Sequence, residues 1–336
     1  MKKNRMMRGF VAVGLTLGLA LTSTSAFAET WRMAVDQSLE SPEGKGVQRF
    51  ADLVKEYSGG DLTIQLFPFE QLGKTDAVME QLASNVIQIQ SAGLVRLIKW
   101  NPDIAYMNAP FMFEGRDHWV RFMHSDLVKG WFDGIAEKAH VAVLGDPTIF
   151  LRGPYRVMVS TKPVQTIDDL SGLRLRMHPD DLAVEAWKYL GCDVRIMAWS
   201  EVYQGLSRSM IDAVNSPISL VESTRFQEAA KNVAEHDEYW QSVGFMMNTD
   251  AYAALSEKDQ QALQKAYVEA SAYGTELVEN SVDDSIKRMK EEGVTFGKME
   301  TGPMVARMQQ FYDEKDAAGA LPEGFLAAVA ATRSAQ

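Results

Sequence analysis

Two short segments of this chain place arginine side chains where they could bind an anion. In YRVMVS, Val157 and Val159 share one face of a predicted strand, and Arg156 points to the other face. In GLRLRM, Arg174 and Arg176 lie together on the face opposite the leucines. Arginine keeps its proton at neutral pH, and its planar fork matches the two oxygens of a carboxylate. Two such side chains on neighbouring strands, facing a cleft, would bind a small organic anion.

The same arginines also have a structural interpretation. Asp168 and Asp169 lie between the two segments and are near enough to form surface ion pairs with them. His178 follows Arg176 by two residues, so it shares the face of Arg176 and is a candidate for the same cleft. A lone histidine is, however, more often a structural residue than a ligand-binding one.

The chain shows no pattern typical of catalysis or of a bound cofactor. Gly73-Lys74-Thr75 resembles the end of a phosphate-binding loop, but Pro68 stands where that loop needs its first glycine. The five histidines have no metal-binding spacing. Cys192 is the only cysteine, which excludes an internal disulfide and a cysteine-based metal site. We therefore expect no cofactor, no metal and no enzymatic activity.

Residues 1–28 have the composition of a secretory signal peptide. Basic residues precede an apolar run over residues 11–21, and Ala26-Phe27-Ala28 supplies the small residues of a cleavage site. This run is shorter than the ~18–20 apolar residues that a membrane helix needs. We therefore expect cleavage after Ala28, with a retained membrane anchor as the alternative.

The charge of the chain restricts its partners. Residues 1–28 hold four basic residues and no acidic ones, so their removal takes the formal charge from −11 to −15. Nucleic acids and anionic membrane surfaces favour a basic partner, so neither is expected to bind. A small anionic solute is not excluded, because two arginines in a pocket set the local potential there.

The pattern of strands and helices predicts an α/β fold. The early chain alternates strand and helix, which favours a mostly parallel sheet with helices on its faces. A second α/β run begins near Tyr155 and includes both arginine strands. The strands expected in the early run cover residues 31–35, 62–66, 86–90 and 141–144, and its helices cover residues 47–57, 76–84 and 117–129. In the second run we expect helices over 180–190 and from 200, and strands over 193–197 and 211–214.

One predicted helix is longer than a lobe formed by either of the two α/β runs. Residues 256–292 contain no proline and a single glycine, Gly274, and Ser256 with Asp259 resembles a capping box. A continuous helix of this length would extend ~54 Å at 1.5 Å per residue. It would have to lie across two lobes, or else break near Gly274 into two ordinary helices.

Several motifs in order resemble one known family. The motifs are FADLVKEYSGGDLTIQLFPFEQLG (50–73), MEQLASNVIQIQSAG (79–93), STKPVQTIDDLSGLRLRM (160–177) and AWSEVYQGLSRSMIDAVNSP (198–217). Together with the long helix, they resemble the DctP-type solute-binding proteins of tripartite ATP-independent periplasmic (TRAP) transporters. The resemblance covers essentially the whole chain after the signal peptide.

The resemblance implies a periplasmic binding protein with two lobes. Each lobe would be a mixed, mostly parallel sheet with flanking helices, and crossing strands and a long helix would join the lobes. We expect lobe I to comprise residues 29–153 plus about 242–281, and lobe II residues 154–241 plus about 282–336. Two site residues are expected from the sequence itself, His178 and Asn215. The resemblance implies the others, which are Arg176, Arg156, Trp199, Ser216, Asp36, Gln37 and Trp240.

The resemblance also implies a function. The lobes would close over a small organic anion held by Arg176 and Arg156, and the closed form would deliver it to a two-part membrane permease with small and large subunits. Candidate solutes are C4-dicarboxylates, hydroxy or sugar acids, and sulfonates such as isethionate. Ser216 stands where the family often has asparagine, and Gly93 where some binders of acidic sugars have glutamate. We expect a monomer; the alternatives are a receptor for another importer or sensor, an exported enzyme acting on an acid, and a structural module.

Overall fold

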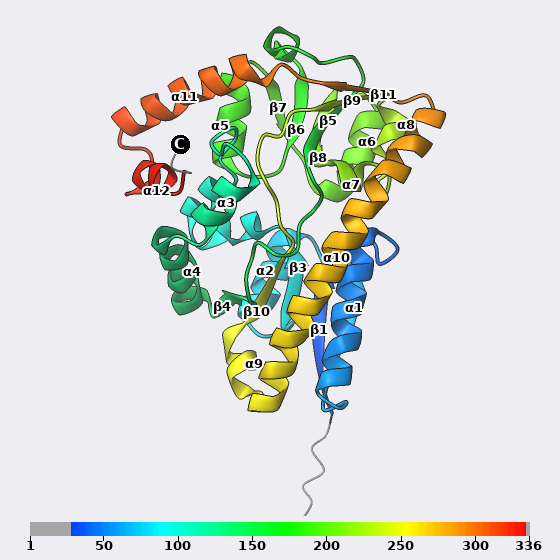
Figure 1. Cartoon of the computed structure of the whole chain (residues 1–336), viewed down its shortest axis with the longest axis vertical. Helices are drawn as coiled ribbons and strands as arrows, with labels where there is room; N and C mark the ends of the chain where they lie inside the picture. Colours follow the sequence, from blue (N-terminus) through cyan, green and yellow to red (C-terminus); the bar gives the residue numbers. More distant parts are fainter. Residues whose placement is uncertain (1–27, 334–336) are drawn as a thin grey trace, which may run out of the picture.

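The computed structural model describes residues 28–333, so the predicted signal peptide lies outside the described residues, apart from Ala28. Two β-sheets, each flanked by helices, form two lobes stacked along the long axis of the molecule (Figure 1). This architecture confirms the predicted two-lobed α/β fold with mixed sheets. Within residues 28–333, no helix combines the length and hydropathy that a membrane crossing needs.

The sheet of the first lobe has five strands in the order β2-β1-β3-β10-β4. β1 pairs in parallel with β2 and β3, whereas β10 is antiparallel to both β3 and β4. Alternating residues of β1 such as Trp31 and Met33 are buried, which fixes the face that packs against helices. The strands are β1 (Glu29–Val35), β2 (Leu62–Pro68), β3 (Ile89–Ala92), β4 (Val141–Val143) and β10 (Gly244–Asn248).

The sheet of the second lobe has six strands in the order β11-β9-β5-β8-β6-β7. The two arginine strands, β5 and β6, are not neighbours, because β8 lies between them; the expectation of adjoining strands was wrong. β8 is antiparallel to β5 and parallel to β6, so the start of β5 and the end of β6 meet at one edge. The strands are β5 (Arg156–Ser160), β6 (Arg174–Met177), β7 (Asp193–Ile196), β8 (Ala213–Pro217), β9 (Asn232–Glu235) and β11 (Thr295–Lys298).

Apolar side chains fill the space between the sheets and their helices. One buried cluster in the first lobe includes Phe50, Phe245 and Tyr267, and one in the second lobe includes Val157 and Phe226. The α-helices are α1 (Pro42–Tyr57), α2 (Thr75–Ala83), α3 (Arg116–Met123), α4 (Asp126–Ala139), α5 (Asp181–Tyr189), α6 (Val202–Ser207), α7 (Ile218–Val221), α8 (Phe226–Ala229), α9 (Thr249–Ala254), α10 (Glu257–Glu291), α11 (Thr301–Ala317) and α12 (Phe325–Ala331). The 3₁₀ helices are η1 (Leu94–Lys99), η2 (Pro102–Asn108), η3 (Ile167–Leu170) and η4 (Trp199–Glu201).

The long helix is continuous. α10 has 35 residues, starts at the N-cap Ser256 and packs against α1 of the first lobe and α7 of the second (Figure 1). A Cβ atom at Gly274 would lie 2.6 Å from Cε2 of Phe150, so this glycine allows close packing and does not break the helix. The alternative of two shorter helices was therefore wrong.

Several expected elements have other bounds in the structure: the helix expected over 47–57 is α1, Pro42–Tyr57, and the strand expected over 211–214 is β8, Ala213–Pro217. The helix expected over residues 117–129 is two helices, α3 and α4, because Ser125 between them accepts a hydrogen bond from the Val128 N–H and starts α4. The strand expected over residues 86–90 starts only at Ile89, because the backbone N–H groups of Val86 and Ile87 bond back to the Gln81 carbonyl at the end of α2.

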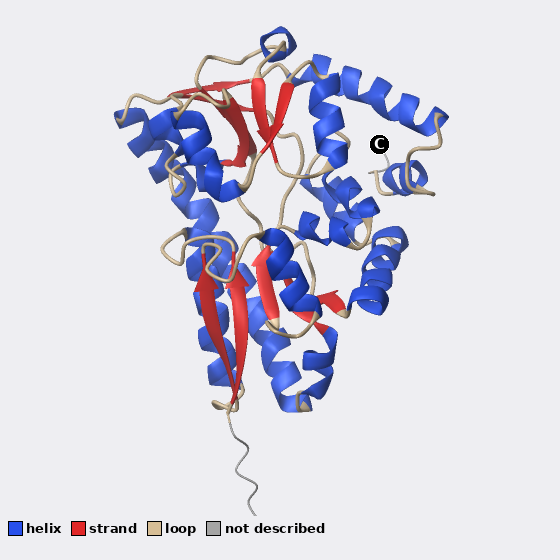
Figure 2. Cartoon of the chain, turned by 180° about the vertical axis from the view of Figure 1, so that it is seen from behind, coloured by secondary structure: helices blue, strands red, loops and turns tan. Residues whose placement is uncertain are grey.

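Two extended segments connect the sheets besides α10 (Figure 2). We call residues 149–155 and 236–243 the crossing segments. The N–H of Val243 donates to the Phe150 carbonyl at 2.7 Å, and the N–H of Arg152 donates to the Gln241 carbonyl at 3.0 Å. The crossing segments therefore pair with each other where they pass between the lobes.

Candidate functional site

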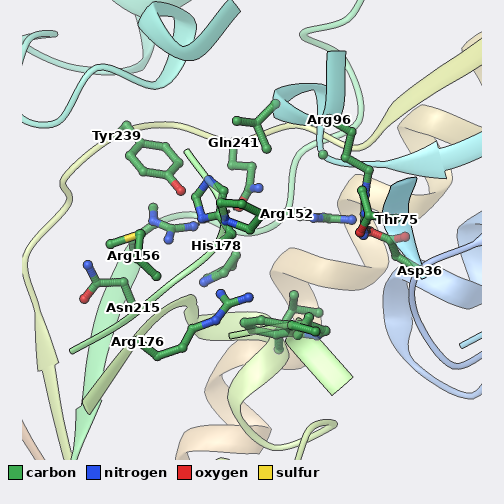
Figure 3. Close-up of a pocket in the computed structure, with 18 of the residues that line it drawn as sticks. Asp36, Thr75, Arg96, Arg152, Arg156, Arg176, His178, Asn215, Tyr239 and Gln241 are labelled. Carbon is green, nitrogen blue, oxygen red and sulfur yellow. Dashed lines mark hydrogen bonds and ion pairs between the residues drawn. The ribbon is translucent and has the colours of Figure 1, made fainter. Parts of the chain in front are cut away.

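A cavity of about 140 Å³ lies between the lobes, next to the crossing segments (Figure 3). An apolar cavity of about 150 Å³ can hold benzene, so this space suits a small organic molecule. Its walls include Asp36 and Arg96 from the first lobe, and Arg176 and Trp199 from the second. The crossing segments contribute Arg152 and Gln241.

Arg176 is a buried cation without a counter-ion. Only 6% of its surface is exposed, and its Nε donates to the Met197 carbonyl at 2.9 Å. In residues 28–333, no carboxylate lies within ion-pair distance of its guanidinium. Burial lowers the pKa of Arg176 to about 10, and the charges of Arg96 and Arg156 act in the same direction. Arg176 is still protonated at neutral pH, and its terminal nitrogens can donate to an anion.

Arg156 lines the same cavity, but its charge is already balanced. Its Nε donates to Glu238 Oε1 at 2.9 Å, and its Nη1 donates to Gln241 Oε1 at 2.8 Å. The guanidinium also lies over the Tyr239 ring, 4.1 Å from the centroid. The Glu238 side chain is 1% exposed, so the ion pair is buried. Arg156 is therefore a paired arginine, in contrast to Arg176.

Glu238 has two further donors. Trp187 Nε1 donates to its Oε2 at 2.8 Å, and Asn215 Nδ2 donates to the same oxygen at 3.0 Å. The Glu238 carboxylate therefore accepts three side-chain hydrogen bonds and links Trp187 and Asn215 to Arg156. Glu238 was not found from the sequence, because it lies 82 residues from Arg156 along the chain.

The two arginines reach the cavity from opposite faces of the sheet. Val157 belongs to the cluster that packs against α10, and Leu175 belongs to the cluster on the other face. Since neighbouring side chains on a strand point to opposite faces, Arg156 and Arg176 leave the sheet on different sides. They both line the cavity because β5 starts and β6 ends at the same edge.

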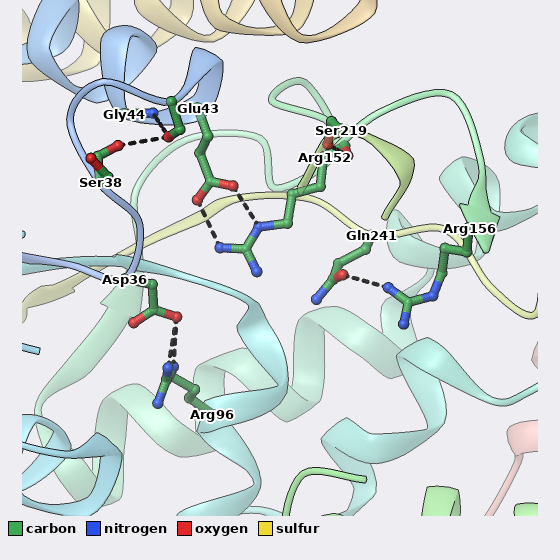
Figure 4. Close-up of polar contacts among 10 residues, drawn as sticks. Asp36, Ser38, Glu43, Gly44, Arg96, Arg152, Arg156, Ser219 and Gln241 are labelled. Atoms are coloured by element: carbon green, nitrogen blue, oxygen red, sulfur yellow. Dashed lines mark hydrogen bonds and ion pairs between the residues drawn. The ribbon is translucent and has the colours of Figure 1, made fainter. Parts of the chain in front are cut away.

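Arg152 is a third arginine in the cavity wall and was missed in the sequence. Its Nε and Nη2 donate to Glu43 Oε2 and Oε1 at 2.9 and 2.8 Å (Figure 4). The two side chains are 7% and 1% exposed. Arg152 lies four residues before Arg156, and this spacing on an extended segment was the available signal.

The Arg152–Glu43 pair is ionised at neutral pH. Burial raises the pKa of Glu43, and the charge and hydrogen bonds of Arg152 oppose this shift. Burial also disfavours the charged form of Arg152, but the charge and hydrogen bonds of Glu43, together with the charge of Asp36, outweigh it and raise the pKa of Arg152. We regard the pair as charged because both carboxylate oxygens accept a guanidinium N–H, and a neutral Glu43 would leave Arg152 buried without a counter-ion.

Asp36 and Gln37, between which the family resemblance placed a first-lobe polar contact, both line the cavity. Arg96, which the sequence did not indicate, binds Asp36 Oδ2 through Nε at 3.2 Å and through Nη2 at 2.6 Å (Figure 4). Arg96 also donates to the hydroxyl of Thr75 at the start of α2. The first-lobe wall therefore contains a second ion pair.

Trp199, Asn215 and His178 also lie in the cavity wall. Arg176 lies 5.3 Å from the centroid of the Trp199 ring, within range of a cation–π contact. Trp199 Nε1 and Asn215 Oδ1 are buried without a hydrogen-bond partner in the described residues. One is a donor and the other an acceptor, and both belong to residues of the cavity wall. His178 Nε2 lies 3.3 Å from Asp180 Oδ2.

Two of the expected site residues do not line the cavity. Ser216 is fully buried opposite Val157, on the face away from Arg156, and its hydroxyl donates to the Pro217 carbonyl at 2.9 Å. Trp240 packs against the apolar core, while its neighbours Tyr239 and Gln241 line the cavity. Because side chains alternate along extended chain, it is the neighbours of Ser216 and Trp240 that line the cavity.

Asp168 and Asp169, which the sequence offered as ion-pair partners, do not pair with the cavity arginines. Asp169 instead accepts hydrogen bonds from the N–H groups of Gln165 and Thr166. Arg174 pairs with Asp212 at 2.5 Å outside the cavity. No group of three or more histidine, cysteine or acidic residues within 28–333 is arranged to hold a metal ion.

The chain matches a known family over most of its length. The sequence model of the DctP family, described as bacterial extracellular solute-binding protein, family 7, matches residues 33–317. The sialic acid-binding periplasmic protein SiaP of Vibrio cholerae is 26% identical over 302 residues, covering 90% of this chain and 92% of that protein. The C4-dicarboxylate-binding periplasmic protein DctP of Rhodobacter capsulatus is 23% identical over 297 residues, covering 87% and 86%.

A solved structure of this family has the same fold as this chain. A TRAP periplasmic solute-binding protein from Chromohalobacter salexigens, crystallised with bound D-glucuronate, superimposes with a TM-score of 0.80. It is 25% identical, and the match covers 91% of this chain and 100% of that one. The family match, these relatives and the two-lobed fold lead to one conclusion: the chain belongs to the DctP family of bacterial extracellular solute-binding proteins, the family of TRAP transporter solute-binding proteins.

Proposed function

We propose that this protein is the periplasmic solute-binding subunit of a TRAP transporter and captures a small organic anion. The observation that carries the proposal is Arg176, a buried and unpaired cation in a cavity between two lobes. Burial of an uncompensated charge is costly, so it is retained where an anion completes the site.

The proposed mechanism starts with solute entering between the lobes. Its acid group pairs with the terminal nitrogens of Arg176, and Arg156 contributes its remaining N–H groups. Closure about the crossing segments then removes water from the ion pair, which strengthens it. Trp199 Nε1 and Asn215 Oδ1 bond to hydroxyl groups of the solute, and Gln37 contacts it from the first lobe.

The solutes named for three related proteins support a small organic anion as the solute of this protein. Sialic acid, C4-dicarboxylates and D-glucuronate, the solutes of the three related proteins, all carry a carboxylate. The closed protein would deliver its solute to a permease of small and large membrane subunits. Removal of residues 1–28 would accompany export, and the protein would act as a monomer without catalysis.

A binding screen tests the proposal. Thermal shift and calorimetry with D-glucuronate, sialic acid, C4-dicarboxylates, hydroxy acids and isethionate should identify at least one acid that binds wild-type protein. Arg176→Met should raise the Kd for that acid at least about 30-fold. This change equals about 2 kcal/mol of binding free energy, the lower end of the cost of breaking a buried, hydrogen-bonded charge pair.

Arg174→Met is the matched control. Arg174 lies on the same strand, two residues away, but its guanidinium pairs with Asp212 outside the cavity. Arg174→Met should bind the acid as wild type does. Equal binding by wild type and Arg176→Met would refute the arginine clamp.

A further inference from the structure

The charges around the cavity can be counted, and the count bears on which organic anion binds. This inference rests on the proposed function. Four arginines line the cavity: Arg96, Arg152, Arg156 and Arg176. Each of the first three has its own carboxylate, respectively Asp36 at 2.6 Å, Glu43 at 2.8 Å and Glu238 at 2.9 Å.

The pairing leaves a single positive charge. Asp36 is the one acidic residue among those lining the cavity in the described structure, and it is already counted. Burial raises the pKa of Tyr239, so its hydroxyl is neutral. Asp180 does not line the cavity; its Oδ1 accepts the Ala183 N–H at the start of α5, and its Oδ2 lies 3.3 Å from Nε2 of the cavity residue His178, so Asp180 balances any charge on that imidazole. The cavity arginines and their partners therefore carry one net positive charge, on Arg176.

The crossing segments offer the cavity hydrogen-bond donors without net charge. Glu43 binds Nε and Nη2 of Arg152, and Nη1 has no hydrogen-bond partner among the described residues (Figure 4). A Cβ atom at Gly93 would lie 3.0 Å from Gln241 Nε2 and 3.4 Å from Arg152 Nη1. The missing side chain at Gly93 keeps both donors open to the cavity.

We propose that this cavity selects acids with one negative charge and a neutral, oxygen-rich tail, and discriminates against dianions of the same length. The acid group pairs with Arg176, and hydroxyl or carbonyl oxygens of the tail accept from Arg152 and Gln241. A second carboxylate in the tail would lose its water and meet an arginine whose charge is already balanced by Glu43. The cost of burying that extra charge is not repaid.

Matched pairs of acids test the selectivity. D-gluconate and D-glucarate differ at one end, where a hydroxymethyl group replaces a carboxylate, and 4-hydroxybutyrate and succinate differ in the same way. Calorimetry at pH 7 and fixed ionic strength should give Kd values for the monoanions that are at least about tenfold lower than for the matched dianions.

Charge-removing variants test the cause. Glu43→Gln keeps the shape of the side chain and an acceptor for Arg152, but leaves Arg152 as a second unpaired cation. The ratio of dianion to monoanion affinity should rise at least about tenfold. Asp36→Asn does the same at Arg96 and provides a second variant if Glu43→Gln fails to fold. Glu222→Gln is the control, because Glu222 pairs with Arg288 outside the cavity at 2.6 Å; its ratio should equal that of wild type.

Each outcome decides a different claim. Equal or tighter binding of the dianions by wild type overturns the charge selectivity and leaves the proposed function standing. Selective wild-type binding that neither Glu43→Gln nor Asp36→Asn changes overturns the charge count as its cause. If none of these acids nor any acid of the binding screen binds wild type, the proposed function fails and this inference fails with it.

Discussion

Arg156 and Arg176 lie in one cavity wall, are equally buried at 6% exposed, and differ in their surroundings. Arg156 is held by Glu238, Gln241 and the Tyr239 ring, so its charge and donors are largely used within the protein. Arg176 has one hydrogen bond, to a backbone carbonyl, and no carboxylate in the described residues. One buried arginine is paired and holds the wall together, and the other is unpaired and is the one that we propose binds the acid group of the solute.

The largest expected effect is on the stability of the paired side. Arg156→Met leaves Glu238 buried without its cation, so the free energy of unfolding should fall by about 3–5 kcal/mol. Urea denaturation measures it. The double variant Arg156→Met/Glu238→Gln removes both charges and should lose clearly less than the single variant. An Arg156→Met protein as stable as wild type would contradict the assignment of Arg156 as a structural residue.

Acid should weaken the same side through His236. Its Nδ1 accepts the Glu238 N–H at 3.2 Å, and burial lowers the pKa of His236 to about 4. Above pH 6.5 the residue is neutral in the folded and unfolded states. As the pH falls from 6.5 to 4, only the unfolded chain takes up the proton, so stability falls, by on the order of 3 kcal/mol.

The control for this pH effect is His236→Asn, which keeps an acceptor near Nδ1 and does not titrate. Urea denaturation between pH 7 and 4 should show a shallower loss of stability for His236→Asn than for wild type. The slopes are compared rather than the absolute values, because the smaller side chain also leaves a cavity. Equal slopes would show that His236 does not contribute.

Arg176 should behave in the opposite way to Arg156 in the absence of solute. Arg176→Met removes an uncompensated buried charge, so the free energy of unfolding should stay equal or rise, by up to about 1–2 kcal/mol. The same denaturation series measures this change. A loss of stability as large as that of Arg156→Met would show that Arg176 is also structural and that the two arginines do not differ in function.

The smallest expected effect is at Trp199. Trp199→Phe keeps an aromatic face near Arg176 and removes the unpartnered Nε1–H. If Nε1 donates to the solute, affinity for the acid found in the screen should fall about 3- to 10-fold, the value of one net hydrogen bond. Stability without solute should fall by only about 1 kcal/mol, because the smaller phenyl ring loses part of the contact that the indole makes with Phe226. Calorimetry with unchanged affinity would exclude this hydrogen bond.

Much of the fold could be predicted from local patterns. The alternation in β1 and the absence of helix breakers over α10 identified elements that the structure confirms. The order of strands in the second sheet could not be predicted, because β8 enters between β5 and β6 from 36 residues further along the chain. Gly274 was read as a possible break because a sequence does not show what packs against a glycine.

The site was predictable in part, for a similar reason. Arg156 and Arg176 were found from alternation, which is a local property. The partners that distinguish them were not found, because Glu238 and Glu43 lie 82 and 109 residues from the arginines they bind. Whether a buried cation is free or paired depends on tertiary contacts, and it is this difference that gives the cavity its charge.

The position of β10 has a consequence for how the protein is made. β4 joins the sheet only by pairing with β10, which lies between β3 and β4. Residues 244–248 of β10 come about 100 residues after β4 in the chain. A chain leaving the ribosome must therefore reach residue 248 before the first lobe can close its sheet, and until then the edges of β3 and β4 have no strand between them. We expect truncated chains that end before β10 to lack a cooperative unfolding transition in calorimetry. Such late completion is compatible with the export proposed above, in which the polypeptide would cross a membrane before it folds.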